Sequence, residues 1–296
     1  MGNILTDIQE KYRHGSICLK FIYINIGIFI ATYILNLIFL LFNTPLTIWR
    51  WFELPADILT FLRQPWSIIT YMFMHANLLH LAFNMLWLWA FGRLFLIFFS
   101  SRHFRGVYFL GGLCGGLLYI LSYNIFPYFS EAVYSAMMVG ASASILAITV
   151  AVAVREPEYQ VNLMFIGRIR LKYVALIMVI ADIMLIVSQN AGGHIAHLGG
   201  ALAGWWFAAA LAKGHDVTAW INKCINWLTE GWAHLTAPRK PKMEVHYGKH
   251  QKDYDFNARK KAQSDEIDRI LDKLKQSGYD SLTAEEKKRL FDAGRK

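Results

Sequence analysis

The chain has 296 residues, of which 55% are hydrophobic and 17% are charged. A soluble domain is about 45–50% apolar and about 25% charged, so this composition excludes a wholly soluble enzyme and a disordered protein. The formal charge is +9, from 30 basic and 21 acidic residues. The basic residues lie in loops between apolar segments and in the C-terminal tail. Membrane topology therefore explains the charge better than nucleic-acid binding does.

Six apolar segments are candidates for membrane spans, because a spanning helix needs about 20 predominantly apolar residues. In hydrocarbon the backbone polar groups must be satisfied within the segment, so we predict helices. The fold class we expect is an all-α membrane protein, a bundle of six transmembrane helices followed by a short cytoplasmic helical C-terminal extension. The predicted spans are residues 20–43, 68–98, 106–127, 137–154, 172–189 and 195–212.

The distribution of basic residues predicts the orientation of the chain. Lys and Arg flank the first span and occur between the second and third spans and between the fourth and fifth. The loops at residues 127–136 and 188–193 carry none. The positive-inside rule then places both termini in the cytoplasm. We find no removable signal peptide or transit peptide at the N-terminus, so we expect a bacterial inner membrane.

Five regions are expected in chain order. Residues 1–19 form a cytoplasmic N-terminus, and residues 20–212 form the membrane domain. Residues 213–237 carry a Trp-rich apolar stripe and are expected to lie on the membrane surface as an amphipathic helix. Residues 238–262 are basic and poor in apolar residues, so we expect a flexible linker. Residues 263–296 are predicted to form a cytoplasmic helical hairpin, with Thr283 and Glu286 as a capping box.

Polar side chains lie near the outer ends of three predicted spans that run in the same direction. His80 and Asn84 are in the second span, Ser142 begins the fourth, and His197 is in the sixth. These groups should therefore lie at a similar membrane depth. Because polar groups in hydrocarbon are energetically unfavourable, they suggest a functional site.

The residue types suit serine chemistry. Ser142 can act as a nucleophile if His197 removes its proton. His80 and Asn84 are four residues apart on one helix face, and both can donate hydrogen bonds to a developing oxyanion. We find no acidic residue in the outer half of these spans, so we predict a Ser–His dyad. Asp182 lies in the middle of the fifth span, where its carboxylate can form hydrogen bonds within the bundle, and we assign it no catalytic role.

Small residues explain how the two helices can approach. Gly200 and Gly204 form a stripe on the predicted helix of His197, and Ala143 and Ala147 flank Ser142. Small side chains let helix backbones come close in lipid.

A metal site is the alternative reading of the four histidines His75, His80, His194 and His197, because imidazole suits transition metals. No Cys, Glu or Asp nearby completes a familiar ligand set, so we expect no metal. We also find no P-loop or dinucleotide fingerprint and expect no cofactor.

The polar motifs resemble those of the rhomboid family of intramembrane serine proteases over residues 62–211. The resemblance rests on three motifs in the family's order, one on each of three helices. The matching residues are His75, His80 and Asn84, then Gly140, Ala141 and Ser142, then His197, Gly200 and Gly204.

The resemblance implies that Ser142 is the nucleophile and His197 the general base. It also implies oxyanion stabilisation by His80, Asn84 and the Ser142 N–H, with His75 and Gly140 in supporting roles. The implied substrates are single-span transmembrane proteins in membrane lipid, cut near the outer end of their helix. A catalytically inactive rhomboid-like protein that binds membrane clients is the alternative.

The chain departs from the family pattern at three positions. The residue after the nucleophile is often Gly and is Ala143 here. Some members stack a Tyr on the base at the position of Leu146, and many have Arg at the position of Ser67. The first two departures leave the Ser–His pair intact and bear on how His197 is positioned, and the third bears on how the loop after the first span is anchored.

Overall fold

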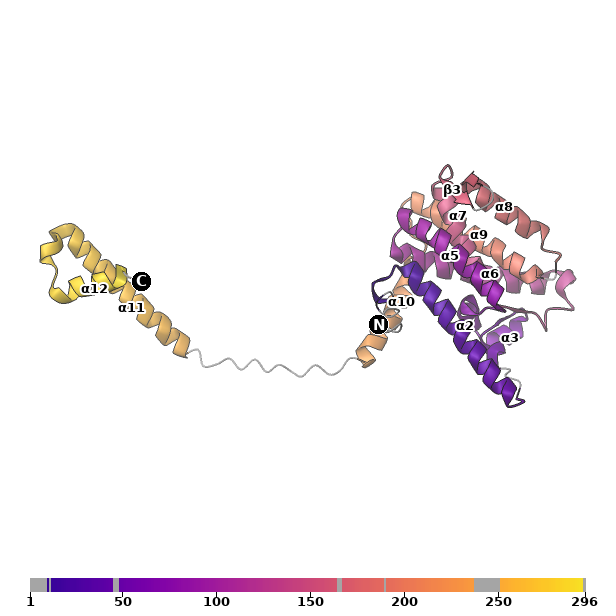
Figure 1. Cartoon of the computed structure of the whole chain (residues 1–296), viewed down its shortest axis with the longest axis horizontal. Coiled ribbons are helices and arrows are strands. Elements are labelled where there is room, and N and C mark those ends of the chain that lie inside the picture. Colours follow the sequence, from indigo (N-terminus) through magenta and orange to yellow (C-terminus); the bar gives the residue numbers. More distant parts are fainter. Residues whose placement is uncertain are drawn as a thin grey trace, which may run out of the picture. The chain divides into compact units, whose positions relative to one another are not determined.

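The computed structural model describes residues 10, 12–44, 48–163, 167–188, 190–236 and 251–294. The chain divides into two compact units, Met1–Leu235 and Thr236–Lys296, each of which is described by itself (Figure 1).

The first unit is a bundle of helices. Its longer helices are α2 (Ile17–Leu41), α5 (Leu78–Phe98), α6 (Ser101–Ile125), α7 (Ser142–Arg155), α8 (Leu171–Met184), α9 (Ala191–Ala212) and α10 (Ala219–Thr236). Short helical turns occur at η1 (Ile48–Trp51), α3 (Ile58–Arg63), α4 (Ser67–Thr70), η2 (Tyr71–Phe73) and η3 (Pro127–Phe129).

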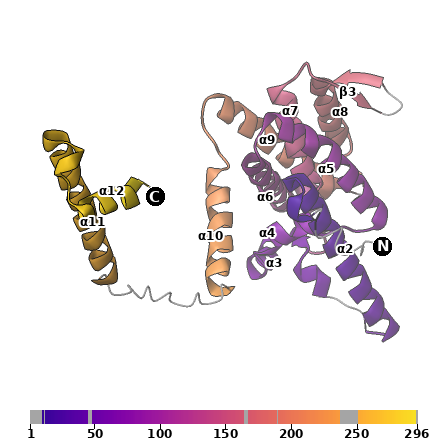
Figure 2. The same cartoon turned by 60° about the vertical axis from the view of Figure 1, so that its left-hand side comes forward.

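Two small antiparallel sheets add to the predicted helical fold. β1 (Leu54–Pro55) pairs with β2 (Met137–Met138), which joins the segment between α2 and α3 to the segment before α7. β3 (Gln160–Leu163) pairs with β4 (Gly167–Arg170) and forms a hairpin between α7 and α8 (Figure 2).

Four helices in the described part of the chain are long and apolar enough to cross a membrane, namely α2, α5, α6 and α9. The chain is therefore an integral membrane protein. The predicted spans 137–154 and 172–189 are shorter helices, α7 and α8, with 14 residues each. At 1.5 Å per residue, each rises about 21 Å.

The second predicted span, 68–98, is not one helix. Its first part forms α4 and η2, and α5 begins only at Leu78. The break follows from capping: the Asn77 side chain accepts a hydrogen bond from the His80 backbone N–H at 2.8 Å, which is the N-cap arrangement of a helix start. The structure therefore places His75 in a loop rather than on a helix.

The segment before this break is anchored to α6. The Tyr71 hydroxyl donates to the Gly112 carbonyl oxygen at 2.7 Å, and the Tyr108 hydroxyl donates to the Met72 carbonyl oxygen at 3.1 Å. All three of Tyr71, Met72 and Tyr108 are buried. These contacts fix the chain immediately before the loop that carries His75.

Helix α7 lies at the centre of the bundle. Every residue from Ala143 to Ala153 is buried, and α5, α6, α8 and α9 pack around the helix. A helix that is apolar on all sides is suited to such a position. Gly111 and Gly115 of α6 face it closely, because a Cβ at either position would lie within 2.7 Å of the Ala147 or Ala143 Cβ. These two glycines of α6 therefore let α6 and α7 pack closely.

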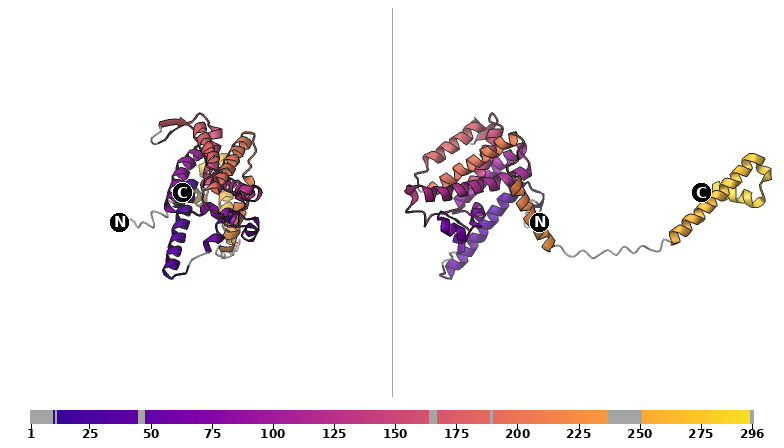
Figure 3. Two further views of the ribbon diagram at one scale, coloured as in Figure 1. Left: turned by 90° about the vertical axis from the view of Figure 1, so that its right-hand side faces the viewer. Right: turned by 180° about the vertical axis from the view of Figure 1, so that it is seen from behind.

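Helix α2 lies at the edge of the bundle and extends beyond it at one end (Figure 3). Its buried residues, Cys18, Phe21, Ile22 and Asn25, are all in its first half. Phe21 packs against the rings of Phe104 and Tyr108 of α6. The second half of α2 exposes apolar side chains, as expected for a surface that faces lipid.

Helix α10 lies within the region 213–237 that the sequence predicts as amphipathic. The Asn222 side-chain amide donates to the Arg102 carbonyl oxygen at 3.2 Å, and Ile221 is buried. Trp220 and Leu228 remain exposed. The position of this helix on a membrane surface stays a prediction.

The second unit consists of α11 (Gln251–Ser277), η4 (Tyr279–Ser281) and α12 (Ala284–Gly294). The capping box at Thr283 and Glu286 is confirmed, since each backbone N–H donates to the other residue's side chain, at 2.8 and 3.3 Å. Residues 251–262, predicted as part of a flexible linker, are helical. This segment is rich in Lys, Arg, Gln and Ala, which are good helix formers. Their helix propensity explains why the segment is helical although it has no apolar stripe. The rest of the predicted linker, residues 238–250, lies outside the described residues.

Candidate active site

The structure brings Ser142 and His197 together. Ser142 is the first residue of α7, and His197 lies in the second turn of α9. The Ser142 Oγ is 2.7 Å from His197 Nε2, within the hydrogen-bond distance that proton transfer requires. Both side chains are partly accessible rather than fully buried.

Close contact between α7 and α9 makes this distance possible. A Cβ at Gly200 would lie 2.1 Å from the Ala143 carbonyl oxygen, and a Cβ at Gly204 would lie 2.2 Å from the Ala147 carbonyl oxygen. Only glycine fits at either position without moving a backbone. The predicted small-residue contact between these helices is confirmed.

The backbone before Ser142 takes a conformation that favours glycine. Gly140 has a φ of +133°, and its N–H donates to the Tyr71 carbonyl oxygen at 3.0 Å. A Cβ at Gly140 would also lie 2.9 Å from His80 Cε1 and 3.5 Å from Ser142 Oγ. Gly140 therefore leaves room for the His80 ring next to the serine. As the first residue of α7, Ser142 has a backbone N–H without a partner inside the helix.

His80 and Asn84 lie one turn apart on α5, as predicted. The Asn84 Nδ2 donates to the His80 carbonyl oxygen at 2.9 Å, and Asn84 is buried. His75 lies against His80, with ring centroids 5.3 Å apart and the rings close to perpendicular. This contact places His75 behind His80, at the edge of the site.

A cavity of about 670 Å³ connects these groups. Ser142, His197, His80 and Asn84 all line it, together with aromatic side chains and the backbone around Gly192. The full lining is Ala76, Asn77, His80, Phe83, Asn84, Trp87, Tyr119, Tyr123, Ala136, Met137, Met138, Val139, Ser142, Asn190, Gly192, Gly193 and His197.

The expectation that no acidic residue lies near the pair is wrong. Asp182 Oδ1 lies 2.8 Å from His197 Nδ1, and it lies at the same distance from His194 Nδ1. Asp182 is 7% exposed. The predicted fifth span put this residue in mid-membrane, but α8 ends at Met184. Asp182 is therefore in the last turn of α8, next to the first turns of α9.

The hydrogen bonds to Asp182 define the tautomer of His197. An ionised carboxylate can only accept, so His197 Nδ1 carries the hydrogen and Nε2 has a free lone pair. That lone pair faces the Ser142 hydroxyl. The two hydrogen bonds also compensate for burying a carboxylate in an apolar bundle.

The histidines predicted as a possible metal set do not form one group. His194 and His197 share Asp182, whereas His75 and His80 contact each other. Among the described residues, three ligating side chains gather with their ligand atoms within 4.8 Å at Asp182, His194 and His197.

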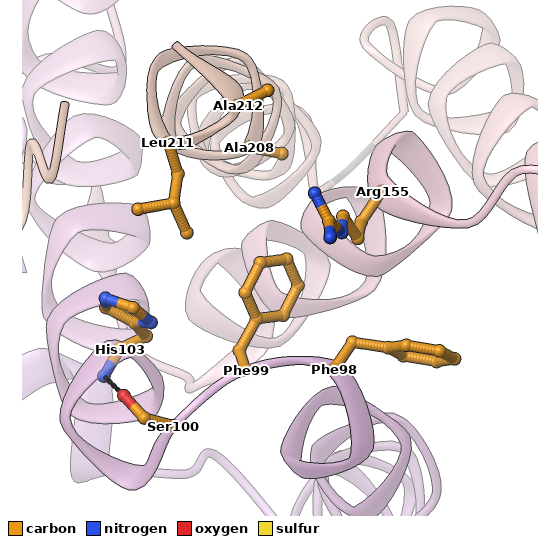
Figure 4. Close-up of a pocket in the computed structure, with 8 residues that line it drawn as sticks. All are labelled: Phe98, Phe99, Ser100, His103, Arg155, Ala208, Leu211 and Ala212. Carbon is orange, nitrogen blue, oxygen red and sulfur yellow. Dashed lines mark hydrogen bonds between the residues drawn. The ribbon is translucent and has the colours of Figure 1, made fainter. Parts of the chain in front are cut away.

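A second cavity, of about 260 Å³, lies at the other ends of α7 and α9 (Figure 4). Arg155, the last residue of α7, and His103 line it with Phe98, Phe99 and Leu211. Arg155 and Ser142 are the two ends of the 14-residue helix α7, which rises about 20 Å between them. This cavity is therefore separate from the serine site.

Comparison with known proteins agrees with the motifs. The family model "Rhomboid domain" matches residues 62–214, more than half of the chain. A second model, described as a family of unknown function (DUF6576), matches residues 250–295, which contain α11 and α12.

Similar proteins include the presenilin-associated rhomboid-like mitochondrial proteins of Homo sapiens and Pongo abelii, each 27% identical over 156 residues, and that of Bos taurus, 26% identical over 155 residues. Each match covers 51% of this chain and 38% of the relative, so the chain matches well under half of each relative's length. Because the family model matches residues 62–214, this chain belongs to the rhomboid family.

Proposed function

We propose that this chain is an intramembrane serine endopeptidase with Ser142 as nucleophile and His197 as general base. The observation that carries the proposal is the 2.7 Å distance between Ser142 Oγ and His197 Nε2 at the wall of a cavity. Membership of the rhomboid family supports the same assignment.

In the first step, Ser142 Oγ attacks the scissile carbonyl carbon and its proton passes to His197 Nε2. The imidazolium then gives this proton to the leaving amine as the C–N bond breaks. The product of the step is an acyl ester on Ser142, and His197 is neutral again.

The carbonyl oxygen gains negative charge during this attack. The His80 ring lies beside Gly140 and Ser142, and the Asn84 amide lines the same cavity. Together with the Ser142 N–H at the start of α7, these groups can donate to the oxyanion. We assign His75 and Gly140 supporting roles, His75 by its contact with His80 and Gly140 by leaving space for that ring.

In the second step, water attacks the ester. His197 Nε2 takes a proton from this water and returns it to Ser142 Oγ as the acid product leaves. The cavity is large enough for several water molecules beside the serine, since each occupies about 30 Å³ in the liquid.

Asp182 extends the predicted dyad to a Ser–His–Asp arrangement. By accepting from His197 Nδ1, its carboxylate keeps the proton-accepting nitrogen directed at Ser142 and stabilises the imidazolium that forms. Asp182 is a positioning residue, because it acts through His197.

The substrates we propose are single-span transmembrane proteins, cut near the outer end of their helix. The reacting groups lie at the N-terminal ends of α5, α7 and α9, which fall in the outer half of the bilayer if both chain termini are cytoplasmic. We propose a bacterial inner membrane as the location, whereas the similar proteins are named as mitochondrial.

The test is cleavage of a model transmembrane substrate in detergent by wild type and by Ser142→Ala. We expect cleavage by wild type and loss of cleavage in Ser142→Ala. Ser144→Ala is the matched control, because Ser144 lies on the same helix and is 1% exposed. It should keep the wild-type rate.

Labelling by a fluorophosphonate probe gives a second readout that needs no substrate. We expect labelling of wild type and of Ser144→Ala, and none of Ser142→Ala. Substrate binding without cleavage or labelling would instead identify the chain as a catalytically inactive client-binding protein.

A further inference from the structure

We propose that Asp182, His194 and His197 form an inhibitory site for a divalent transition-metal ion of the zinc type. Zinc bound there would occupy the nitrogen of His197 that faces away from Ser142. The proposal goes beyond the proposed proteolysis, which uses no metal, and its consequence for activity rests on that function.

The donor set supports zinc. Two imidazoles and one carboxylate are ligands that Zn²⁺ commonly uses, with a fourth position left to water. Both His Nδ1 atoms lie 2.8 Å from the same oxygen, Asp182 Oδ1, and all three ligand atoms lie within 4.8 Å of one another.

The distances from the two imidazoles to the carboxylate need only a small adjustment to accept an ion. With metal–ligand bonds of about 2.0–2.2 Å, neighbouring ligand atoms of a tetrahedral zinc site lie about 3.3 Å apart. Each His Nδ1 would therefore move away from Asp182 Oδ1 by about 0.5 Å. The rings of His194 and His197 are nearly perpendicular, at 86°, so two imidazoles can approach one ion from different directions.

The group is also reachable. The side chains of His194, His197 and Asp182 are 15%, 22% and 10% exposed, so none is fully enclosed. His197 also lines the cavity of about 670 Å³.

Metal binding at Nδ1 would reverse the role of His197. In the metal-free protein Nδ1 carries the hydrogen and Nε2 has the lone pair. When Nδ1 donates its lone pair to the ion, the hydrogen of the neutral ring must lie on Nε2. His197 then keeps its single hydrogen but can no longer take the proton of Ser142, so the serine is not activated.

The metal site gives His194 a role that the proposed mechanism of proteolysis does not. It lies three residues before His197, directs the same ring nitrogen at Asp182, and has no part in the proposed mechanism. In a purely proteolytic site one histidine on Asp182 would be sufficient.

The test uses the full chain, purified in detergent with a tag that contains no histidine and freed of metal by a chelator. Zn²⁺ binding is measured by competition with a chromogenic chelator, and Co²⁺ is used as a spectroscopic probe. We expect one tight site per chain, with visible absorption from Co²⁺ of low coordination number. Ser142→Ala should bind the metal as wild type does, because Ser142 is not a ligand.

The ligand variants are His194→Ala and Asp182→Asn. We expect each to weaken Zn²⁺ binding by about a hundredfold or more, since losing only a residue that supports a ligand already costs about 10–100-fold. His103→Ala is the matched control. His103 also lies near a carboxylate, 3.7 Å from Asp216, and is not part of the serine site. It should leave metal binding and cleavage unchanged.

Inhibition is measured for each protein relative to its own metal-free rate. Zn²⁺ should inhibit wild type and His103→Ala at the concentrations at which it binds, and His194→Ala should need at least about a hundredfold more. Wild-type binding that is absent, or that survives in His194→Ala, would overturn the inference. Metal binding to Ser142→Ala, in a chain that proves to cleave nothing, would retain the metal site and reject only the proposed protease.

Discussion

Asp182 Oδ1 lies 2.8 Å from His197 Nδ1, although the two residues belong to different helices. Some rhomboid proteins stack a tyrosine on the base, and this chain has the buried Leu146 at that position. The orientation of His197 here depends instead on a hydrogen bond to α8. The last turn of α8 is thus part of the proposed catalytic machinery.

Replacing Asp182 with Asn should lower kcat by about 10²–10⁴, because an amide can also donate and so permits the wrong tautomer of His197. The carboxylate also stabilises the protonated ring. Its loss should therefore lower kcat and leave KM nearly unchanged, because the protonated ring forms only as the reaction proceeds. The measurement is kcat and KM for cleavage of the model substrate by wild type and by Asp182→Asn.

A purely structural role of Asp182 would give a different result. It would lower the amount of folded protein and leave kcat per folded molecule unchanged. Thermal unfolding in detergent, recorded for the same samples, separates the two outcomes.

Replacing His80 with Ala should lower kcat by about 10²–10³, the usual effect of removing one oxyanion donor. KM should change little, because the interaction forms only as the oxyanion develops. Leu79→Ala is the control, since Leu79 is adjacent on α5 and 70% exposed. Equal rates for His80→Ala and wild type would contradict the oxyanion role.

Replacing Gly200 with Ala should destabilise the bundle by about 1–3 kcal/mol, the typical effect of overpacking. The added methyl group would lie 2.1 Å from the Ala143 carbonyl oxygen and must push α9 away from α7. Because Ser142 and His197 are on these two helices, activity should be lost together with stability.

Gly27→Ala is the control for this experiment. A Cβ at Gly27 meets nothing within 4 Å, and alanine favours helix over glycine by about 1 kcal/mol. Its melting temperature should therefore stay the same or rise. A Gly200→Ala protein with wild-type stability and activity would show that the close helix contact is not required.

Replacing Glu286 with Gln should loosen the start of α12. The Thr283 N–H and the Lys273 ammonium hold the pKa of Glu286 below its ordinary value of 4.5. The ionised form therefore stabilises the fold above about pH 4.5, and this contribution is lost as the pH falls through the lowered pKa.

Amide hydrogen exchange in the full chain checks this prediction. Glu286→Gln should exchange faster than wild type in α12 at neutral pH, and the difference should disappear in acid. Glu285→Gln, in the same turn, is the control and should exchange as wild type does. A difference that persists unchanged at low pH would contradict the assignment.

The sequence was sufficient to predict which helices meet at the site. Ser142 and His197 lie near the starts of spans that run in the same direction, which predicts that they meet, and Gly200 and Gly204 predict the close contact between those spans. The direction in which a span crosses the membrane and the spacing of its small residues can both be inferred from the sequence of the span and its flanking loops.

Two features of the structure could not be predicted, because hydropathy does not show where a helix begins or ends. Hydropathy places Asp182 in mid-membrane because the apolar run continues past Met184, where α8 ends. The apolar run from residue 68 likewise hid the start of α5 at Leu78. Asn77, a favoured N-cap residue, was the available signal for that second boundary.

The break in the helix before α5 also bears on how water, the second substrate of the hydrolysis, reaches Ser142. A membrane-spanning chain tolerates non-helical backbone only where protein covers it or where it borders a hydrated space. Ala76 and Asn77 belong to this interruption and line the cavity that contains Ser142. The non-helical backbone before α5 and the hydrolysis of the acyl ester both require water from the aqueous phase. One opening in the fold can supply water to both.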